Sequence, residues 1–159
     1  MKKINLILMR HGKAEKDGAS DHERQLAPRG REQARKAGHE FHEIFGHIDR
    51  AIVSDSTRTR QTAAELLGSV PIRNLNLESK LYTVNSQIEF VDAITPLISN
   101  SDKTLLIVGH NPTISLLASK YTAQDFELGT GEFIIATIES ADWHTALESS
   151  GCWTVKYPS

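Results

Sequence analysis

Short apolar runs alternate with amphipathic segments along this chain, and their order restricts the folds that are open to it. Helical spacing of apolar residues marks four segments, at residues 28–45, 57–68, 86–99 and 110–120. The runs that read as strands are 4–9, 50–55, 103–109, 132–140 and 152–157. Strand–helix alternation of this kind predicts an α/β fold. We expect a three-layer sandwich whose central sheet is mostly parallel and has helices on both faces.

The ends of several helices carry local sequence signals. Gly46 is placed to end the first helix, and Pro96 is expected to bend or shorten the third. Asn111 is expected to cap the fourth helix, with Pro112 at its first position. Between residues 70 and 84 the pattern does not separate helix from strand. The predicted buried face of the first helix consists of Ala34, Ala37, Phe41, Ile44 and Phe45.

Length and charge exclude several classes of protein. The 159 residues suit one domain, residues 1–159, and 39% hydrophobic with 24% charged residues is ordinary for a globular protein. The formal net charge of −2 gives no bulk attraction to nucleic acid or to an anionic membrane. An anion-binding function would therefore need a local concentration of cations.

The expected compartment is the cytoplasm. The first apolar run is too short for the core of a signal peptide, and no run approaches the roughly 20 apolar residues of a membrane span. Cys152 is the only cysteine, so we expect neither a disulfide framework nor a cysteine-based metal cluster.

Residues capable of chemistry directly follow three of the predicted strands. Ligands of open α/β sheets bind beyond the carboxyl ends of the strands, so three parallel neighbours would bring these residues together. The helix after Asn111 would add backbone N–H donors and a favourable dipole for an anion. The three sets are Arg10-His11-Gly12, then Ser54-Asp55 with Arg58 and Arg60 soon after, and Gly109-His110-Asn111.

These residue types favour phosphoryl transfer through a phosphohistidine. The planar fork of arginine bonds two phosphate oxygens at once and stays charged. Histidine can act as nucleophile, acid or base near neutral pH. Gly12 is expected to let the backbone approach the ligand closely.

Simpler interpretations account for the remaining histidines. A single histidine after a strand is more often a packing residue than a catalyst, but two of them beside arginines weaken that interpretation. His39, His42 and His47 suggest a solvated helix face, because the segment "HEFHE" lacks the H-E-x-x-H spacing of a zinc protease. His22 and His144 are expected to be structural or exposed.

Other phosphatase chemistries fail on spacing. Pro158 stands six residues after Cys152, where a cysteine phosphatase needs arginine, and Thr57 stands where a D-x-D enzyme needs its second aspartate. The chain also lacks a P-loop motif and the carboxylate clusters of a two-metal site. Histidine is the one nucleophile with a credible site.

Four ordered motifs resemble those of a known family. They are "LMRHGKAE", "LAPRGREQA", "SDSTRTRQTA" and "LLIVGHNPTI", and together they resemble the histidine phosphatase superfamily, with its phosphoglycerate mutase-like fold. Within that superfamily the segments "GHNP" and "DHERQL" and the "TGEF…W…YP" ending look like the SixA-type phosphohistidine phosphatases. The resemblance implies a single histidine phosphatase domain over residues 1–159.

The resemblance also implies roles for individual residues. His11 would be the nucleophile and would carry the phosphoryl group covalently. Arg10 and Arg58 would clamp the phosphoryl oxygens, and His110, as a cation, would donate a hydrogen bond to them. Arg24 would border the substrate pocket. Gly12 and Asn111, beside the two histidines, are expected to contact substrate, and no metal or cofactor is implied.

The sequence departs from the family pattern at three places. The third motif usually reads R-A-x-Q-T, so Arg60 is either a second pocket cation or a surface residue. Gln25 and Ala27 replace residues that are often proline and threonine, with small expected effects on loop stiffness. Relatives that cleave alkyl phosphates carry an acidic residue soon after the third strand. In the corresponding segment "LNLESKLYTVNSQIEF", Glu78 is the only acidic residue before Glu89, and alignment on "LYTVNS" places no carboxylate at the expected position.

The missing acid favours a substrate whose phosphoryl group is bound to nitrogen, and the expected partner is a protein that carries phosphohistidine. Two alternatives stay open. One is a small-molecule phosphomonoesterase of the same fold, and the other is a phosphate-binding module without catalytic activity.

Overall fold

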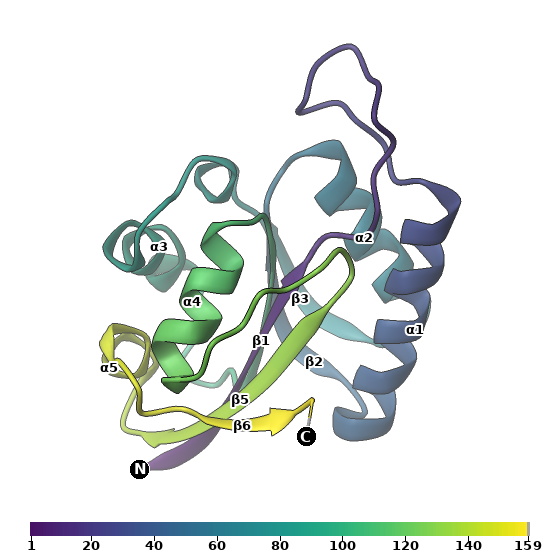
Figure 1. Ribbon diagram of the computed structural model, residues 1–159. Coiled ribbons are helices and arrows are strands. Elements are labelled where there is room, and N and C mark those ends of the chain that lie inside the picture. Colours follow the sequence, from purple (N-terminus) through teal and green to yellow (C-terminus); the bar gives the residue numbers. More distant parts are fainter. Residues whose placement is uncertain (159) are drawn as a thin grey trace.

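The computed structural model describes residues 1–158 and confirms the α/β fold (Figure 1). Its strands form a six-stranded sheet in the order β3-β2-β4-β1-β5-β6. The strands are β1 (Lys2–Arg10), β2 (Ile48–Val53), β3 (Ile72–Leu77), β4 (Thr104–Gly109), β5 (Phe133–Ser140) and β6 (Thr154–Tyr157). The helices are α1 (Pro28–Phe45), α2 (Thr57–Leu67), α3 (Gln87–Ile94), α4 (Thr113–Thr122) and α5 (Trp143–Glu148), with 3-10 turns η1 (Ser79–Tyr82) and η2 (Thr95–Leu97).

The sheet is mostly parallel, as expected. Strands β3, β2, β4 and β1 run in one direction, and β5 runs antiparallel to both of its neighbours. The two late strands pair at the sheet edge, as their alternating pattern suggested. This order places β2, β4 and β1 side by side, so that their carboxyl ends lie at one edge of the sheet.

Helices cover both faces of the sheet (Figure 1). Strand β1 sends Ile7 and Met9 into one core cluster, which Phe41 of α1 and Leu66 of α2 complete. The alternate residues of the strand enter the other cluster, because successive strand residues point to opposite faces. Helices α3, α4 and α5 close that second cluster.

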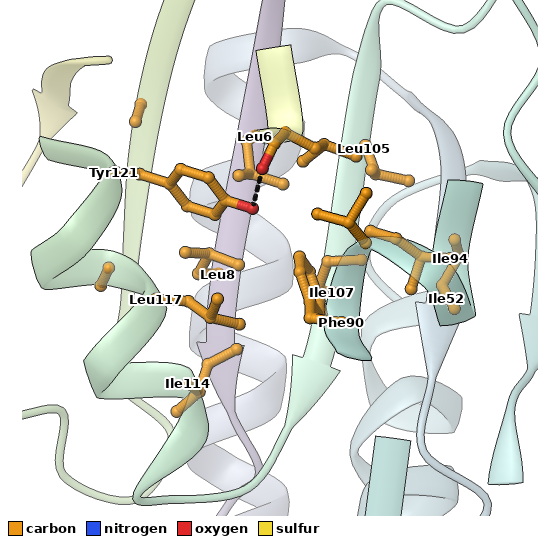
Figure 2. Packing of buried hydrophobic residues seen from close by; sticks show 14 of the residues in the cluster. Leu6, Leu8, Ile52, Phe90, Ile94, Leu105, Ile107, Ile114, Leu117 and Tyr121 are labelled. Atoms are coloured by element: carbon orange, nitrogen blue, oxygen red, sulfur yellow. Dashed lines mark hydrogen bonds between the residues drawn. The ribbon is translucent and has the colours of Figure 1, made fainter. Parts of the chain in front are cut away.

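Figure 2 shows the second cluster, in which apolar side chains of α3 and α4 pack on β1 and β4. Tyr121 is fully buried there, and its hydroxyl donates to the backbone oxygen of Leu147 at 2.7 Å. Burial of apolar area stabilises such a core by about 25 cal/mol per Å². The strands beneath the polar residues of interest are therefore held between two packed layers.

Several local predictions are confirmed, and the placement of Ile44 needs correction. Gly46 ends α1, and α3 stops at Ile94 with Pro96 inside the following 3-10 turn. Ile44 is wrongly placed in the core, since it is 49% exposed on the last turn of α1, where the helix passes the beginning of the sheet. Residues 70–84 form the edge strand β3 and the turn η1.

The start of α4 differs from its prediction by one residue. Pro112 is the residue before the helix, and α4 begins at Thr113. The side chain of Asn111 still reaches the first turn, where its Oδ1 accepts from the backbone N–H of Ser115 at 3.2 Å. Helix α5 was not predicted, because six residues are too few to show a helical period.

Across residues 1–158 none of the helices combines the length and the apolar character that crossing a membrane requires.

Candidate active site

The two predicted histidines lie side by side at the carboxyl ends of neighbouring strands. Arg10 pairs with Gly109 in the register of β1 and β4, so the residues that follow them, His11 and His110, emerge together. Their ring centroids are 5.4 Å apart. Ser54, at the end of β2, joins them through its backbone N–H, which donates to the oxygen of Val108 at 3.1 Å.

The His11 ring is buried, with 6% of the residue exposed. Its Nδ1 lies 2.7 Å from the carbonyl oxygen of Gly12, which can only accept, so Nδ1 carries the proton. Arg58 donates from Nε to His11 Nε2 at 3.3 Å. Burial lowers the His11 pKa to about 4, with the charges of Arg58 and Arg10 acting in the same direction and the Gly12 hydrogen bond opposing them. Nε2 therefore carries no proton at neutral pH, and its lone pair accepts the hydrogen bond from Arg58.

His110 is neutral at neutral pH with these neighbours, which differs from the expected cation. Burial, together with repulsion from a protonated His11 and from Arg58, lowers its pKa to about 3. Arg58 Nη2 lies 3.4 Å from Nδ1, so Nδ1 accepts and Nε2 donates to Ser54 Oγ at 2.8 Å. A phosphoryl dianion beside the ring would raise this pKa.

Arg58 connects both rings to the loop between β1 and α1. The residue is 6% exposed in the first turn of α2, and its Nη1 donates to the backbone oxygen of Asp21 at 2.8 Å. Arg60 is exposed, because it lies two positions after Arg58 on α2 and its side chain therefore points to nearly the opposite side of the helix. Of the two interpretations of Arg60, the structure supports a surface residue.

Asp21 and Tyr82 belong to this site and were not singled out from the sequence. The Asp21 carboxylate accepts from the Tyr82 hydroxyl, from Arg58 Nη2 at 3.2 Å and from Arg24 Nε at 3.1 Å. The Tyr82 hydrogen bond and the Arg58 and Arg24 charges lower the Asp21 pKa to about 2. The i,i+3 spacing of Asp21 and Arg24 was a usable signal, whereas Tyr82 lies in the segment that the pattern left ambiguous.

Two further arginines border the site. Arg24 Nη1 donates to the backbone oxygen of Glu15 at 3.1 Å, which fixes its guanidinium across the loop. Arg10 Nη1 donates to the oxygen of Leu128 at 3.2 Å. The Arg10 Nε is buried and has no hydrogen-bond partner within residues 1–158.

A cavity of about 310 Å³ opens between these side chains. It brings together six of the seven predicted site residues, together with Lys13 and Lys16. Among the described residues, none of those that line it is a carboxylate. The lining residues are Arg10, His11, Lys13, Ala14, Lys16, Arg24, Arg58, His110, Asn111 and Thr130.

Gly12 and Asn111 are placed differently from each other. Gly12 packs against α1, where an added Cβ would lie 2.5 Å from the oxygen of Gly30, and its N–H donates to Thr62 Oγ1 at 3.1 Å. The structure thus gives Gly12 a packing reason, while contact with substrate stays a prediction. Asn111 lines the cavity, and its amide donates to the oxygen of Leu128 at 2.7 Å.

Glu78 and the histidines of α1 lie apart from this cluster, whereas the His22 ring packs against Tyr82 with centroids 4.9 Å apart. Glu78 caps η1 by accepting from the Lys80 N–H at 3.2 Å. His39 and His42 are exposed on α1. No group of three or more His, Cys, Asp or Glu within residues 1–158 is arranged to hold a metal ion.

The arrangement combines an unprotonated ring nitrogen with several guanidinium groups around one small cavity. Such a set of groups can attack phosphorus and stabilise the charge that spreads over the phosphoryl oxygens.

Comparisons with known proteins agree with this chemistry. Residues 6–82 match the model of the histidine phosphatase superfamily (branch 1). The uncharacterized protein MT1313 of Mycobacterium tuberculosis is 38% identical over 113 residues, which span 69% of this chain and 67% of that protein.

Two solved structures share the fold. One is described as a candidate phosphohistidine phosphatase SixA from Nakamurella multipartitia, with a TM-score of 0.82, 24% identity and coverage of 99% of this chain and 98% of that one. The other is a mycobacterial glucosyl-3-phosphoglycerate phosphatase, with a TM-score of 0.60, 16% identity and 98% of each chain covered. The chain belongs to the histidine phosphatase superfamily.

Proposed function

We propose that this protein is a phosphatase that works through a phosphohistidine on His11. One observation carries the proposal: the His11 ring is buried and neutral, its Nδ1 proton is held by Gly12, and its Nε2 faces Arg58. This arrangement fixes the tautomer and points the basic nitrogen toward the groups that would hold a phosphoryl oxygen.

The reaction divides into two displacements at phosphorus. In the first, His11 Nε2 forms a bond to phosphorus while the bond to the leaving group breaks, and that group departs with its electron pair. In the second, a water oxygen forms a bond to phosphorus while the bond from phosphorus to Nε2 breaks and its electron pair returns to Nε2. The proton that water loses passes to a phosphate oxygen or to solvent, and inorganic phosphate is released. Arg10 and Arg58 offset the charge on the phosphoryl oxygens, and His110, once protonated beside the dianion, donates to one of them.

We infer that the substrate is phosphohistidine on a protein. The lining of the cavity lacks a carboxylate among the described residues, and Asp21, with a pKa of about 2, does not hold a proton at neutral pH. A departing alkoxide needs a proton in the transition state. An imidazole leaves neutral when its other nitrogen carries a proton, so it needs less help. The likeness in fold to the structure described as a SixA protein supports the same substrate class.

A small-molecule phosphomonoesterase is the second candidate. The small size of the cavity favours it, and so does the shared fold with a glucosyl-3-phosphoglycerate phosphatase. A phosphate-binding module without catalysis is the third, and the complete set of histidines and arginines speaks against it.

We also propose the broader properties that the sequence suggested. Residues 1–159 form a single histidine phosphatase domain, of which Ser159 lies outside the described residues. The protein needs no metal or cofactor, because its own cations supply the positive charge, and chelators should leave turnover unchanged. The cytoplasmic location stays a prediction that the single free cysteine, Cys152, supports.

A substrate panel tests the proposal. Turnover should fall steeply from a phosphohistidine peptide through an aryl phosphate to an alkyl phosphate, and Glu78→Gln should leave aryl phosphate hydrolysis nearly unchanged. The aryl oxide, with a pKa of roughly 10 or below, is intermediate as a leaving group. Efficient cleavage of a sugar phosphate with a large Glu78→Gln defect would instead support the phosphomonoesterase. Binding of phosphate without turnover of any substrate would support the binding module.

A further inference from the structure

A second and larger cavity, of about 840 Å³, lies at the opposite end of the sheet. Its lining residues include residues of the last turn of α1, of strand β6 and of the beginnings of β1 and β4. We call it the amino-end cavity, because the parallel strands start there. Asn5 on its floor precedes His11 by six residues. At about 3.3 Å per residue, the two sites are roughly 20 Å apart.

The floor of the amino-end cavity is a row of polar side chains across three neighbouring strands. Asn5 of β1 stands opposite Thr104 of β4 and Thr137 of β5 in the sheet register. Asn5 Nδ2 donates to Thr104 Oγ1 at 3.2 Å, and the two threonines are only 5% and 7% exposed. The next residues on the same face toward the active-site edge are the apolar Ile7, Leu106 and Ile135. The polar row is therefore a local change of chemistry at the bottom of a hollow.

The walls of the amino-end cavity are apolar and aromatic. Ile44 and Phe45 of α1 form one side, which explains why Ile44 is exposed and not in the core. Tyr157 of β6 also lines the cavity beside Glu40 of α1, and its ring stacks on Phe133 with centroids 5.1 Å apart and planes 13° apart. A flat apolar group between these walls would remove apolar surface from water.

The rim of the amino-end cavity concentrates positive charge in a chain whose net charge is −2. Among the described residues that line it, Asp49 is the one carboxylate. Asp49 Oδ2 already accepts from the backbone N–H groups of Lys103 and Thr104 at 2.8 and 2.9 Å, and Oδ1 lies 3.0 Å from His47 Nε2. The cations around it are Lys3, Arg73, Lys103 and Lys156.

We propose that the amino-end cavity binds an aromatic organic anion of about the size of a nucleoside monophosphate. The volume lies within the range of about 300–1,000 Å³ that is usual for small-molecule sites. The aromatic part would pack on Phe45 and Tyr157, the polar row would bond its edge, and the anionic group would meet the rim lysines. This proposal does not depend on the reaction proposed for His11.

Titration of the ¹⁵N-labelled protein with AMP, followed by NMR, tests the proposal. AMP should shift the amide signals of Asn5, Thr104 and Thr137. Adenosine, which lacks the anion, and inorganic phosphate, which lacks the ring, should each bind this cavity at least tenfold more weakly. Any phosphate released by turnover would move signals near His11 and leave those of the amino-end cavity in place.

Charge-reversal variants locate the binding. Lys156→Glu and Lys103→Glu, on different parts of the rim, should each weaken AMP binding at this cavity by about five- to tenfold. Lys120→Glu is the matched control, because Lys120 is exposed on α4, on the other face of the sheet. Aryl phosphate hydrolysis should be unchanged in all three variants. An absence of shifts at the cavity, equal affinity for adenosine, or equal loss in Lys120→Glu would overturn the proposal.

Discussion

The two ends of the sheet both gather cations, but they hold them in different ways. At the carboxyl end the cavity is about 310 Å³, and Arg58 is 6% exposed and bonded to both histidines. At the amino end the cavity is about 840 Å³, and the Arg73 side chain is 65% exposed. The smaller cavity has buried, mutually bonded cations, and the larger one has exposed cations around a buried polar floor.

This difference separates chemistry from binding. Transition-state stabilisation requires groups that are already in place when charge develops, because any rearrangement then costs free energy. The carboxyl end satisfies that requirement through burial and mutual hydrogen bonds. Exposed cations contribute a general attraction for anions that salt weakens. Cavity volume alone would therefore have indicated the wrong end of the sheet for catalysis.

Removal of the nucleophile at the carboxyl end of the sheet should have the largest effect on turnover. His11→Ala should lower aryl phosphate turnover by roughly 10³-fold or more, on the scale seen when other covalent enzymes lose their nucleophile. The matched variant His144→Ala, at a half-exposed residue of α5, should keep full activity. Circular dichroism should show the native fold for both. Retention of a tenth of the activity in His11→Ala would contradict the assignment.

Loss of the buried cation should give the next largest effect. Arg58→Ala removes a donor to both rings and to the phosphoryl oxygens, so turnover should fall by about 10²–10³-fold. Arg60→Ala, two residues along the same helix, should stay within about twofold of the wild type, since exposed pairs contribute little. Steady-state kinetics with an aryl phosphate measures both. Equal losses would mean that the pocket lies on the other side of α2.

Burial of the two histidines should make stability depend on pH. Below pH 6.5 the unfolded chain protonates both rings, whereas the folded chain keeps His11 and His110 neutral down to about pH 4 and about pH 3. The free energy of unfolding should therefore decrease as pH falls from 6.5, by about 1 kcal/mol per pH unit for each ring.

Urea unfolding at pH 6.5 and pH 5 measures this dependence. The double variant His11→Asn with His110→Asn should lose less stability over that interval than the wild type. The matched pair His39→Asn with His42→Asn, exposed on α1, should behave like the wild type. An identical pH dependence in both double variants would show that the two buried rings contribute no more than exposed rings to the pH dependence of the free energy of unfolding.

Neutralising Asp21 should give the smallest effect and should act on affinity. Its carboxylate stands beside Arg58 and Arg24, so it competes with an incoming anion. Asp21→Asn should lower the inhibition constant of inorganic phosphate by about threefold, and kcat should fall because Arg58 loses an anchor. Asp92→Asn, exposed on α3, is the control. Weaker phosphate inhibition in Asp21→Asn would show that the carboxylate assists binding.

The sequence predicted what is local or periodic. Two apolar runs predicted the strands that lead to Arg10-His11 and to Gly109-His110. Parallel pairing of β1 with β4 then brings the two histidine rings together. The bond network of Arg58 could not be predicted, because it depends on how the loop with Asp21 folds back over α2. Tyr82 lies in the short turn η1, which is too short to show a periodic pattern of apolar residues. The neutrality of His110 follows from burial, which a motif does not show.

Identification of the phosphorylated atom tests the central claim most directly. Rapid quench of the wild-type protein with an aryl phosphate, followed by ³¹P NMR of the labelled protein, should show an acid-labile, base-stable phosphoramidate on His11. The phosphoryl group should be on Nε2, because Gly12 holds the proton of Nδ1. Label on a serine, on the cysteine or on Nδ1 of His11 would contradict the proposed mechanism.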